Sequence, residues 1–272
     1  MKQFENLNIV ITGATGVIGS TFVKALVEQG ANVGILGRSE DKIVNLQQRI
    51  DIEHKQTVGL IADVLDKKSL EQAKNTFNHQ FGQIDVLING AGGNNSNATT
   101  DDEMYDENSE KSFFDLSEEG VDQVFKLNYT GTFLPSQVFG QDVVASEQGT
   151  IINISSMNAF TPLTKIPAYS GAKASVSNFT QWLSTYFAGQ IRVNAIAPGF
   201  FETAQNKGLL RNDDGSYSER ANKILSQTPM QRFGEPEELL GTLYWLMDKK
   251  QSGFVTGVVV PVDGGFNSYS GV

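Results

Sequence analysis

The chain has 272 residues, of which 39% are hydrophobic and none is cysteine, so it can bury one sizeable α/β core but offers no disulfide or thiolate chemistry. The formal net charge of −10 argues against nucleic acid and anionic membranes as partners, and a composition with only two histidines (His54 and His79, both expected on exposed helices) argues against a metal site. No stretch approaches 18 consecutive apolar residues, and the first residues lack an apolar signal core, so we expect a cytoplasmic protein without a membrane span.

The first predicted strand, residues 8–12, runs directly into a glycine-rich turn. The turn reads T-G-A-T-G-V-I-G from Thr12 to Gly19 and leads into an amphipathic helix expected from Val17 to Gln29. A strand, a glycine turn and a helix in this order favour a dinucleotide site over a plain tight turn, because glycine lets the backbone approach the pyrophosphate and the helix N-terminus attracts it. The residues expected to contact the cofactor here are Gly13, Thr15, Gly16, Val17, Ile18 and Gly19.

The end of the second predicted strand, residues 33–36, bears on the choice of cofactor. An acidic residue at this place typically binds the ribose 2′-hydroxyl of NAD, whereas an arginine accommodates the 2′-phosphate of NADP. At the end of this strand, Gly37 has no acidic side chain, and Arg38 places a positive charge next to it. The sequence therefore favours NADP(H), with NAD(H) as the alternative; Arg38 as a merely exposed residue before the next helix stays open.

Two further strand ends add candidate cofactor contacts. After a helix expected over residues 40–53, the third strand (57–62) ends at Asp63 and Val64, where the carboxylate would accept a hydrogen bond from an adenine amino group or cap the helix expected over 67–81. The fourth strand (85–89) ends at Asn89, followed by Gly90 and Ala91. Small residues at the carboxyl end of a parallel strand leave room for a ligand.

Residues 93–117 interrupt the alternation of strands and helices. The segment is polar, rich first in asparagine and then in acidic residues. A loop this long in a compact domain is often a lid or a binding element, and a solvated excursion is the alternative. We expect Phe113, Phe114 and Leu116 to anchor its end.

A long helix expected over residues 118–145 carries Asn128 in its middle. A polar residue at this place with Gly131 nearby predicts a local distortion that frees backbone groups for water. The fifth strand, residues 151–154, then leads to Ser156 and through a loop with two prolines to a helix over 168–187.

Tyr169 and Lys173 lie four residues apart on that helix and therefore on one face. An ammonium beside a phenol favours the phenolate, which predicts a lowered pKa for Tyr169 and a general acid/base near neutral pH. Ser156 can hydrogen-bond a substrate carbonyl or alcohol oxygen. Ser156, Tyr169 and Lys173 together suit an enzyme that transfers a hydride between a cofactor and a substrate. The alternative is that the Tyr–Lys pair has no function, since such pairs are common on exposed helix surfaces.

The remaining chain completes a parallel sheet. The sixth strand, residues 191–197, precedes P-G-F-F-E-T, in which Pro198, Gly199, Phe201 and Thr203 are expected at the nicotinamide end of the cofactor. Residues 204–230 predict one or two helices over the substrate and a turn at 212–215, followed by a helix over 237–247 and a last strand over 255–262. This order predicts a single α/β domain over residues 1–272 of the doubly wound Rossmann type: a seven-stranded parallel sheet with helices on both faces, an insert at about 93–117 and a substrate-covering segment at about 200–230.

Over nearly its whole length the chain resembles the short-chain dehydrogenase/reductase family. The matching positions are Thr12 to Gly19, Asp63, Asn89 to Gly92, Asn128, Ser156, Tyr169, Lys173, Pro198, Gly199 and Thr203. Two positions depart from the family pattern: Val17 stands where the short reductases mostly have glycine, and Gly90 where asparagine is usual.

The resemblance implies roles for the four catalytic candidates. Tyr169 would donate or accept the proton, Lys173 would lower its pKa and bind the nicotinamide ribose, and Ser156 would orient the substrate oxygen. Asn128 would hold a water that links Lys173 to solvent. Thr203 would bind the carboxamide or phosphate end of the cofactor. The family also implies a homotetramer, with the helices over 118–145 and 168–187 and the last strand as candidate interfaces.

Within the family, the segments around Ser156, Pro198 and the C-terminus resemble the D-mannonate oxidoreductase (fructuronate reductase) group, which implies interconversion of D-mannonate and D-fructuronate. For such a sugar acid the expected contacts are Ser156, Tyr169, Asn94, Asn95, Asn158 and Lys165, with Lys207 or Arg211 from the covering segment.

Three alternatives stay open. A gluconate- or polyol-type dehydrogenase would use the same residues. An epimerase would fit the glycine spacing but normally needs a further C-terminal domain. A cofactor-sensing module without catalysis would be expected to lack the tyrosine or the lysine, and both are present.

Overall fold

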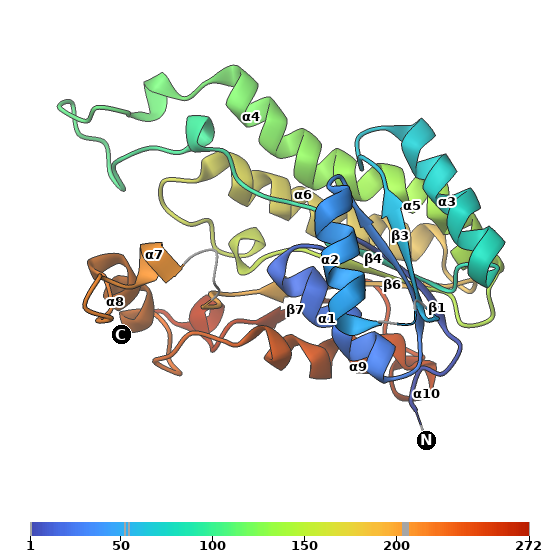
Figure 1. Ribbon diagram of the computed structural model, residues 1–272. Helices are drawn as coiled ribbons and strands as arrows, with labels where there is room; N and C mark the ends of the chain where they lie inside the picture. The colour runs from blue at the N-terminus through green and yellow to red at the C-terminus, as the bar shows by residue number, and fades with distance from the viewer. Residues whose placement is uncertain (1, 52, 54, 203–206, 272) are drawn as a thin grey trace.

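Seven parallel strands form the centre of the protein, in the spatial order β3-β2-β1-β4-β5-β6-β7 (Figure 1). The computed structural model describes residues 2–51, 53, 55–202 and 207–271. The strands are β1 (Asn8–Thr12), β2 (Asn32–Gly37), β3 (Thr57–Ile61), β4 (Val86–Asn89), β5 (Thr150–Ile154), β6 (Arg192–Pro198) and β7 (Val259–Val262). Every neighbouring pair is parallel, which confirms the predicted doubly wound α/β sheet.

The central strands are buried on both faces, as expected for continuous apolar runs in a parallel sheet. Every residue of β4, β5 and β6 is buried. Strand β7 lies at the edge, is half-buried, and begins at Val259 rather than at the predicted Val255. The reason is Gly257, whose φ of +78° takes the backbone out of the extended conformation just before the strand.

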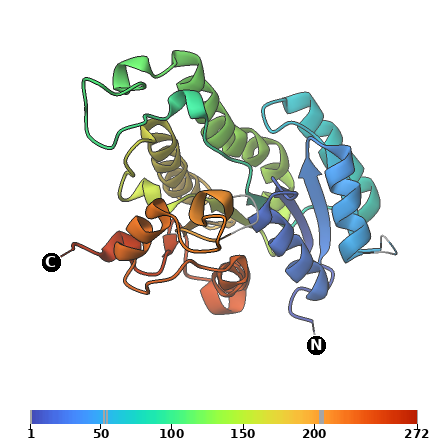
Figure 2. The same cartoon turned by 60° about the vertical axis from the view of Figure 1, so that its left-hand side comes forward.

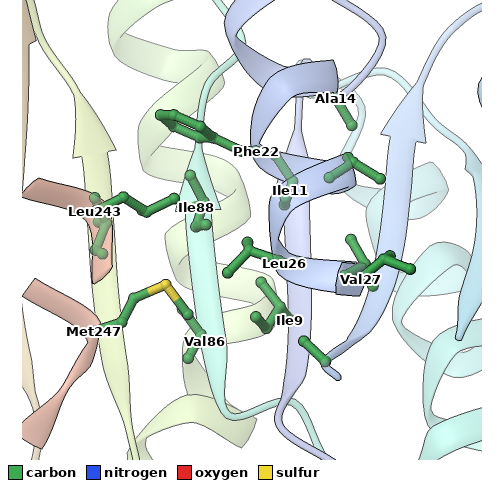
Figure 3. Close-up of a cluster of buried hydrophobic side chains, with 14 of the residues drawn as sticks. Ile9, Ile11, Ala14, Phe22, Leu26, Val27, Val86, Ile88, Leu243 and Met247 are labelled. Carbon is green, nitrogen blue, oxygen red and sulfur yellow. The ribbon is translucent and has the colours of Figure 1, made fainter. Parts of the chain in front are cut away.

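Helices cover both faces of the sheet. They are α1 (Val17–Glu28), α2 (Glu40–Ile50), α3 (Lys67–Phe81), α4 (Glu118–Phe125), α5 (Gly131–Ala145), α6 (Pro167–Tyr186), α7 (Lys207–Leu210), α8 (Glu219–Ser226), α9 (Leu240–Met247) and α10 (Lys249–Ser252). One core lies between the sheet and α1, α2 and α9, and Figure 3 shows Phe22 and Leu26 of α1 packed beside Ile9, Ile88 and Leu243. The second core joins the sheet to α3, α5 and α6.

The predicted distortion around Asn128 is present. A π-helical turn, Lys126–Thr130, separates α4 from α5. The hydroxyl of Thr132 donates to the Asn128 carbonyl at 2.8 Å, so part of the altered backbone is satisfied by a side chain. Such turns inside helices are frequent at functional sites because they re-aim side chains.

The insert over residues 93–117 and helices α7 and α8 lie on the same side of the molecule, beyond the carboxyl ends of the strands (Figure 2). The expectation that Phe113 and Phe114 anchor the insert is wrong: they are 67% and 79% exposed. Their rings pack on each other edge-on, with centroids 5.7 Å apart, and Phe114 packs likewise on Tyr105 at 6.0 Å, so the aromatic contacts stay within the insert. The amide of Ser117 donates to the Asn97 carbonyl and holds the two ends of the insert together.

Among the helices described, none combines the length and the apolar character needed to cross a membrane.

Candidate active site

The glycine turn after β1 is shaped by direct backbone packing against the loop after β4. Gly13 has a φ of +65°, and a Cβ atom built there would lie 2.7 Å from the Gly90 carbonyl oxygen. A Cβ on Gly19, in the first turn of α1, would lie 2.4 Å from the Gly13 carbonyl oxygen. Only glycine fits at these two positions, because the neighbouring atoms belong to the backbone and cannot rotate away.

The N-terminus of α1 is suited to an anion. Gly16 is the N-cap and gives no side-chain hydrogen bond, and the first turn of the helix contains no acidic residue. In α2, by contrast, Ser39 caps the helix and Glu40 and Asp41 occupy the first turn. Uncapped amide groups and the helix dipole attract a pyrophosphate, so this turn fits the phosphate groups of a dinucleotide. Val17 opens the helix and Ile18 packs half-buried against the adjoining core, so the valine at an expected glycine position starts the helix without distorting it.

The end of β2 lies beside the glycine turn. A Cβ on Gly37 would contact the Thr15 hydroxyl oxygen at 3.4 Å, which puts the second strand next to the turn. Arg38 is exposed, and no hydrogen bond or ion pair within the described residues engages its guanidinium. Asp63 accepts a hydrogen bond from the Leu65 amide at 2.9 Å, while Asp66 caps α3. The alternative that Asp63 caps this helix is therefore wrong. Val64 packs against Gly131 of α5.

The Asn89 side chain is held below the site by its amide nitrogen, whereas its buried side-chain oxygen has no hydrogen-bond partner among the described residues. Its amide donates to the Ser136 hydroxyl and to the Asn153 side-chain oxygen, both at 2.9 Å. The side chain therefore points into the layer between the sheet and α5. Gly90 donates its amide to Thr12, and a Cβ at Gly90 would lie 2.8 Å from the Thr12 carbonyl oxygen, which explains a glycine here. The amide of Ala91 also donates a hydrogen bond to the Thr12 hydroxyl.

Lys173, Asn128 and Gly92 meet at the centre of the site. A Cβ on Gly92 would lie 2.6 Å from the Asn128 side-chain oxygen and 3.1 Å from the Lys173 ammonium nitrogen. The ammonium of Lys173 donates to the Ile154 carbonyl at 2.8 Å, and the Asn128 amide donates to the Gly93 carbonyl at 2.7 Å. These bonds hold both side chains, although they are almost completely buried. The sequence could not indicate the Ile154 carbonyl, because every residue type offers a backbone acceptor, whereas Gly92 belongs to the G-A-G-G run that matches the family.

The predicted lowering of the tyrosine pKa is wrong for this structure. Burial raises the pKa of the Tyr169 phenol above 10, and a hydrogen bond with the Ser156 hydroxyl only partly opposes this shift. Burial also lowers the pKa of Lys173 to about 8. The ammonium lies 5.7 Å from the centre of the Tyr169 ring and is directed at Ile154, so the loss of water around the phenol outweighs the attraction of the charge. The contact of Ser156 with Tyr169 supports their joint action on one substrate oxygen.

The loop after β6 is held against the loop after β7. The Gly199 amide donates to the Val262 carbonyl at 2.9 Å, and a Cβ on Gly199 would lie 2.6 Å from the Asp263 Cα. Pro198 ends β6, and the Phe201 ring packs on Gly234, which leaves a small cavity of about 100 Å³ between these loops. Thr203 lies outside the described residues.

The predicted substrate residues fall into two groups. Asn158 is 5% exposed, follows Ser156 in the same 3-10 turn, and its side-chain amide makes no hydrogen bond within the described chain. Asn94 is exposed and donates to the Thr99 hydroxyl at 3.0 Å. Lys165 is half-buried at the start of α6, with a φ of +70°. These three leave polar atoms available for a ligand.

The side chains of two other predicted substrate residues, Arg211 and Asn95, contact other residues of the protein. Arg211 pairs with Glu202 through two nitrogens, at 2.6 and 2.9 Å, and lies over the Tyr217 ring at 4.3 Å. The charge of Arg211 is thus paired within the protein, and its contact with substrate stays a prediction. Asn95 caps a short turn and donates to Gln123 at 2.7 Å. Nothing is described for the Lys207 side chain.

An uncapped helix start at the carboxyl edge of the sheet, next to a buried serine and lysine and a half-buried tyrosine, defines a nicotinamide-dependent oxidoreductase. The comparisons with known proteins agree. The family model described as short chain dehydrogenase matches residues 7–214. The chain belongs to the short-chain dehydrogenase/reductase family.

Several relatives match over the full length. An uncharacterised oxidoreductase, UxuB, of Bacillus subtilis strain 168 is 53% identical over 98% of each chain. A solved structure from Haemophilus influenzae, provisionally described as a D-mannonate oxidoreductase with bound NAD, is 50% identical with a TM-score of 0.94, over 98% of this chain and 97% of that one. The 5-keto-D-gluconate 5-reductase of Escherichia coli K12 is 30% identical over 95% of this chain and 94% of its own.

Proposed function

We propose that the protein reduces the ketone of a sugar acid, D-fructuronate, to D-mannonate and catalyses the reverse oxidation. The observation that carries this proposal is the contact of Ser156 with Tyr169, with Lys173 behind them and the open amide of Asn158 beside them. The 50% identity to the Haemophilus structure supports the choice of substrate. Reduction of 5-keto-D-gluconate is the second candidate, supported by the Escherichia coli relative.

The residues divide the work between proton transfer and orientation. The nicotinamide of a bound cofactor supplies or accepts the hydride. Ser156 donates a hydrogen bond to the ketone oxygen and so aligns it with the phenol. Tyr169 transfers its proton to that oxygen in reduction and takes it back in oxidation. A neutral phenol, which the raised pKa favours, is the form that a proton donor needs. Lys173 stabilises the phenolate that remains, and Asn128 is proposed to hold a water that returns the proton from solvent.

The cofactor is proposed to bind with its pyrophosphate at the start of α1 and its adenosine ribose near Gly37 and Arg38. The exposed Arg38 supports NADPH, while the NAD in the related Haemophilus structure supports NADH. The assay that tests the proposed function therefore uses NADPH and NADH in parallel.

The assay measures initial rates of NADPH and NADH oxidation with D-fructuronate, 5-keto-D-gluconate and neutral keto sugars. We expect the highest kcat/KM with D-fructuronate. An Arg38→Ala variant is expected to lose about tenfold or more in kcat/KM for NADPH, because a charge-assisted contact to the 2′-phosphate disappears, and to keep its rate with NADH. A higher kcat/KM for another ketone would refute the substrate, and an Arg38→Ala variant with an unchanged NADPH rate would refute the role of this arginine.

We also propose that residues 1–272 act as one cytoplasmic domain, with the insert and the segment over 200–230 covering the substrate. A homotetramer is proposed from two exposed apolar surfaces. One is an aromatic row on α4–α6, formed by Phe125, Phe133, Trp182 and Tyr186, which are 37%, 37%, 54% and 67% exposed. The other is edge strand β7 with the fully exposed Phe254 before it. Patches of this kind mark subunit contacts.

Light scattering checks the oligomer. The unmodified protein is expected at the mass of four chains, and Trp182→Asp is expected to produce smaller species, because a charge is introduced into an apolar contact. A stable monomer of the unmodified protein would contradict the proposal.

A further inference from the structure

Three basic side chains gather around one carboxylate where the insert meets helix α8. Lys223 of α8 forms an ion pair and a hydrogen bond with Glu103 of the insert. The pKa of Glu103 lies below its ordinary value chiefly because Lys223 donates this hydrogen bond, and the charges of Lys165 and Arg220 act in the same direction. These three cations lie beside an insert that also carries Asp101 and Asp102 next to Glu103, in a chain with a net charge of −10. Ammonium and guanidinium groups that face a carboxylate attract other anions as well.

Lys165 links this cluster to the catalytic residues. It lies four residues before Tyr169, immediately before the first turn of α6. Its carbonyl accepts a hydrogen bond from the Thr100 amide of the insert at 2.9 Å. Its φ of +70° is uncommon for a residue with a long side chain, and such conformations persist where the surroundings enforce them, often at ligand sites. The segment that leads into α6, the helix that carries Tyr169, is thus joined to the insert at Lys165.

We propose that Lys165, Arg220 and Lys223 form the subsite for the carboxylate of a sugar-acid substrate, and that Glu103 fills this subsite until the substrate replaces it. The inference rests on the proposed function, because it assigns the acidic end of that substrate. With the ketone at Ser156 and Tyr169, the open amide of Asn158, two residues after Ser156, is left for a hydroxyl of the substrate.

The exchange of Glu103 for a substrate carboxylate is easy. The side chains of Lys223 and Glu103 are 63% and 36% exposed, and exposed pairs of this kind favour the paired state by about fivefold or less. A carboxylate replaces a carboxylate, so the cluster does not lose its counter-charge during binding. The competing explanation is a latch that only fastens the insert to α8. A latch would affect acidic and neutral substrates alike.

The test compares D-fructuronate with a neutral keto sugar, D-fructose, by the ratio of their kcat/KM values. Lys165→Gln and Lys223→Gln are each expected to lower this ratio about tenfold, because a charge-assisted contact to the carboxylate is lost. Glu103→Gln is expected to lower the KM for D-fructuronate by up to about fivefold, because the internal competitor loses its charge. Lys250→Gln, which removes an exposed lysine on α10 across the molecule (Figure 1), is the matched control and should keep the ratio.

Lys165→Arg is the control for a loss of folding at this position. It keeps the positive charge, so the ratio of the two kcat/KM values should stay within about threefold of the unmodified protein. An unchanged ratio in both glutamine variants, or an equal loss for both sugars, would overturn the carboxylate subsite while leaving the reductase function intact. Calorimetric titration with D-gluconate, a sugar acid without a ketone, separates the two proposals. If no keto acid were reduced but D-gluconate bound about tenfold more weakly to Lys165→Gln than to the unmodified protein, the function would fail and the subsite would stand.

Discussion

Replacing Tyr169 with phenylalanine is expected to lower kcat/KM for ketone reduction by about 10² to 10⁴-fold, the usual contribution of a positioned general acid. The substitution removes one oxygen atom and keeps the ring that packs against the small core of Ala98, Val124, Ala168 and Ala172. The protein should therefore fold, and the affinity for the cofactor should change by only a few-fold. Stopped-flow or steady-state reduction of D-fructuronate measures the loss.

The reason for so large an effect is that nothing else near the ketone can donate a proton equally well. The Ser156 hydroxyl aligns the oxygen, but its own pKa is too high for a general acid at neutral pH. The Lys173 ammonium, with a pKa lowered to about 8 by burial, is directed at the Ile154 carbonyl instead. Tyr244→Phe, the same chemical change on α9 in the opposite core, is the control and should retain the full rate. A Tyr169→Phe enzyme with a third or more of the normal activity would rule out the proposed mechanism.

Replacing Gly19 with alanine is expected to destabilise the protein by about 1–3 kcal/mol and to weaken cofactor binding at least tenfold. The new methyl group would lie 2.4 Å from the Gly13 carbonyl oxygen and 2.8 Å from the Ala14 Cα. Both are backbone atoms of the glycine turn, so relief of the clash must move the turn that is proposed to hold the cofactor. Chemical denaturation measures the stability, and fluorescence titration with NADH and NADPH measures the binding.

Gly241→Ala provides a matched comparison with the opposite sign. Gly241 also lies in the first turn of a helix, α9, but a Cβ there meets no atom within 4 Å. Alanine is the better helix former, so this variant should be more stable than the unmodified protein by up to about 1 kcal/mol and should bind the cofactor normally. If the two variants behaved alike, close packing of Gly19 would not be the reason for its glycine.

Much of the fold follows from patterns within a few residues of each other. The limits of β1 and α3 agree with the predicted ranges, 8–12 and 67–81. The π-helical turn at Asn128 lies where a polar residue next to Gly131 predicted a distortion. Ser156, Tyr169 and Lys173 meet because a strand end and a helical spacing of four bring them together over a short length of chain.

Contacts between distant residues could not be predicted in the same way. Nothing in the local sequence pattern indicated that Glu202 would form an ion pair with Arg211, or that Lys223 would form one with Glu103, which is 120 positions away in the sequence. Phe113 and Phe114 looked like anchors, yet they pack on each other and on Tyr105 in an insert that stays exposed.

The sequence by itself therefore determined the order of the strands and helices and the glycine turn, and it indicated the candidate catalytic set, because hydrogen-bond periodicity and side-chain direction repeat locally along the chain. Only the tertiary structure decided which charges are already paired and which polar groups remain open. It also decided the direction of the Tyr169 pKa shift, since burial depends on every element packed around the phenol and here exceeds the effect of one nearby ammonium.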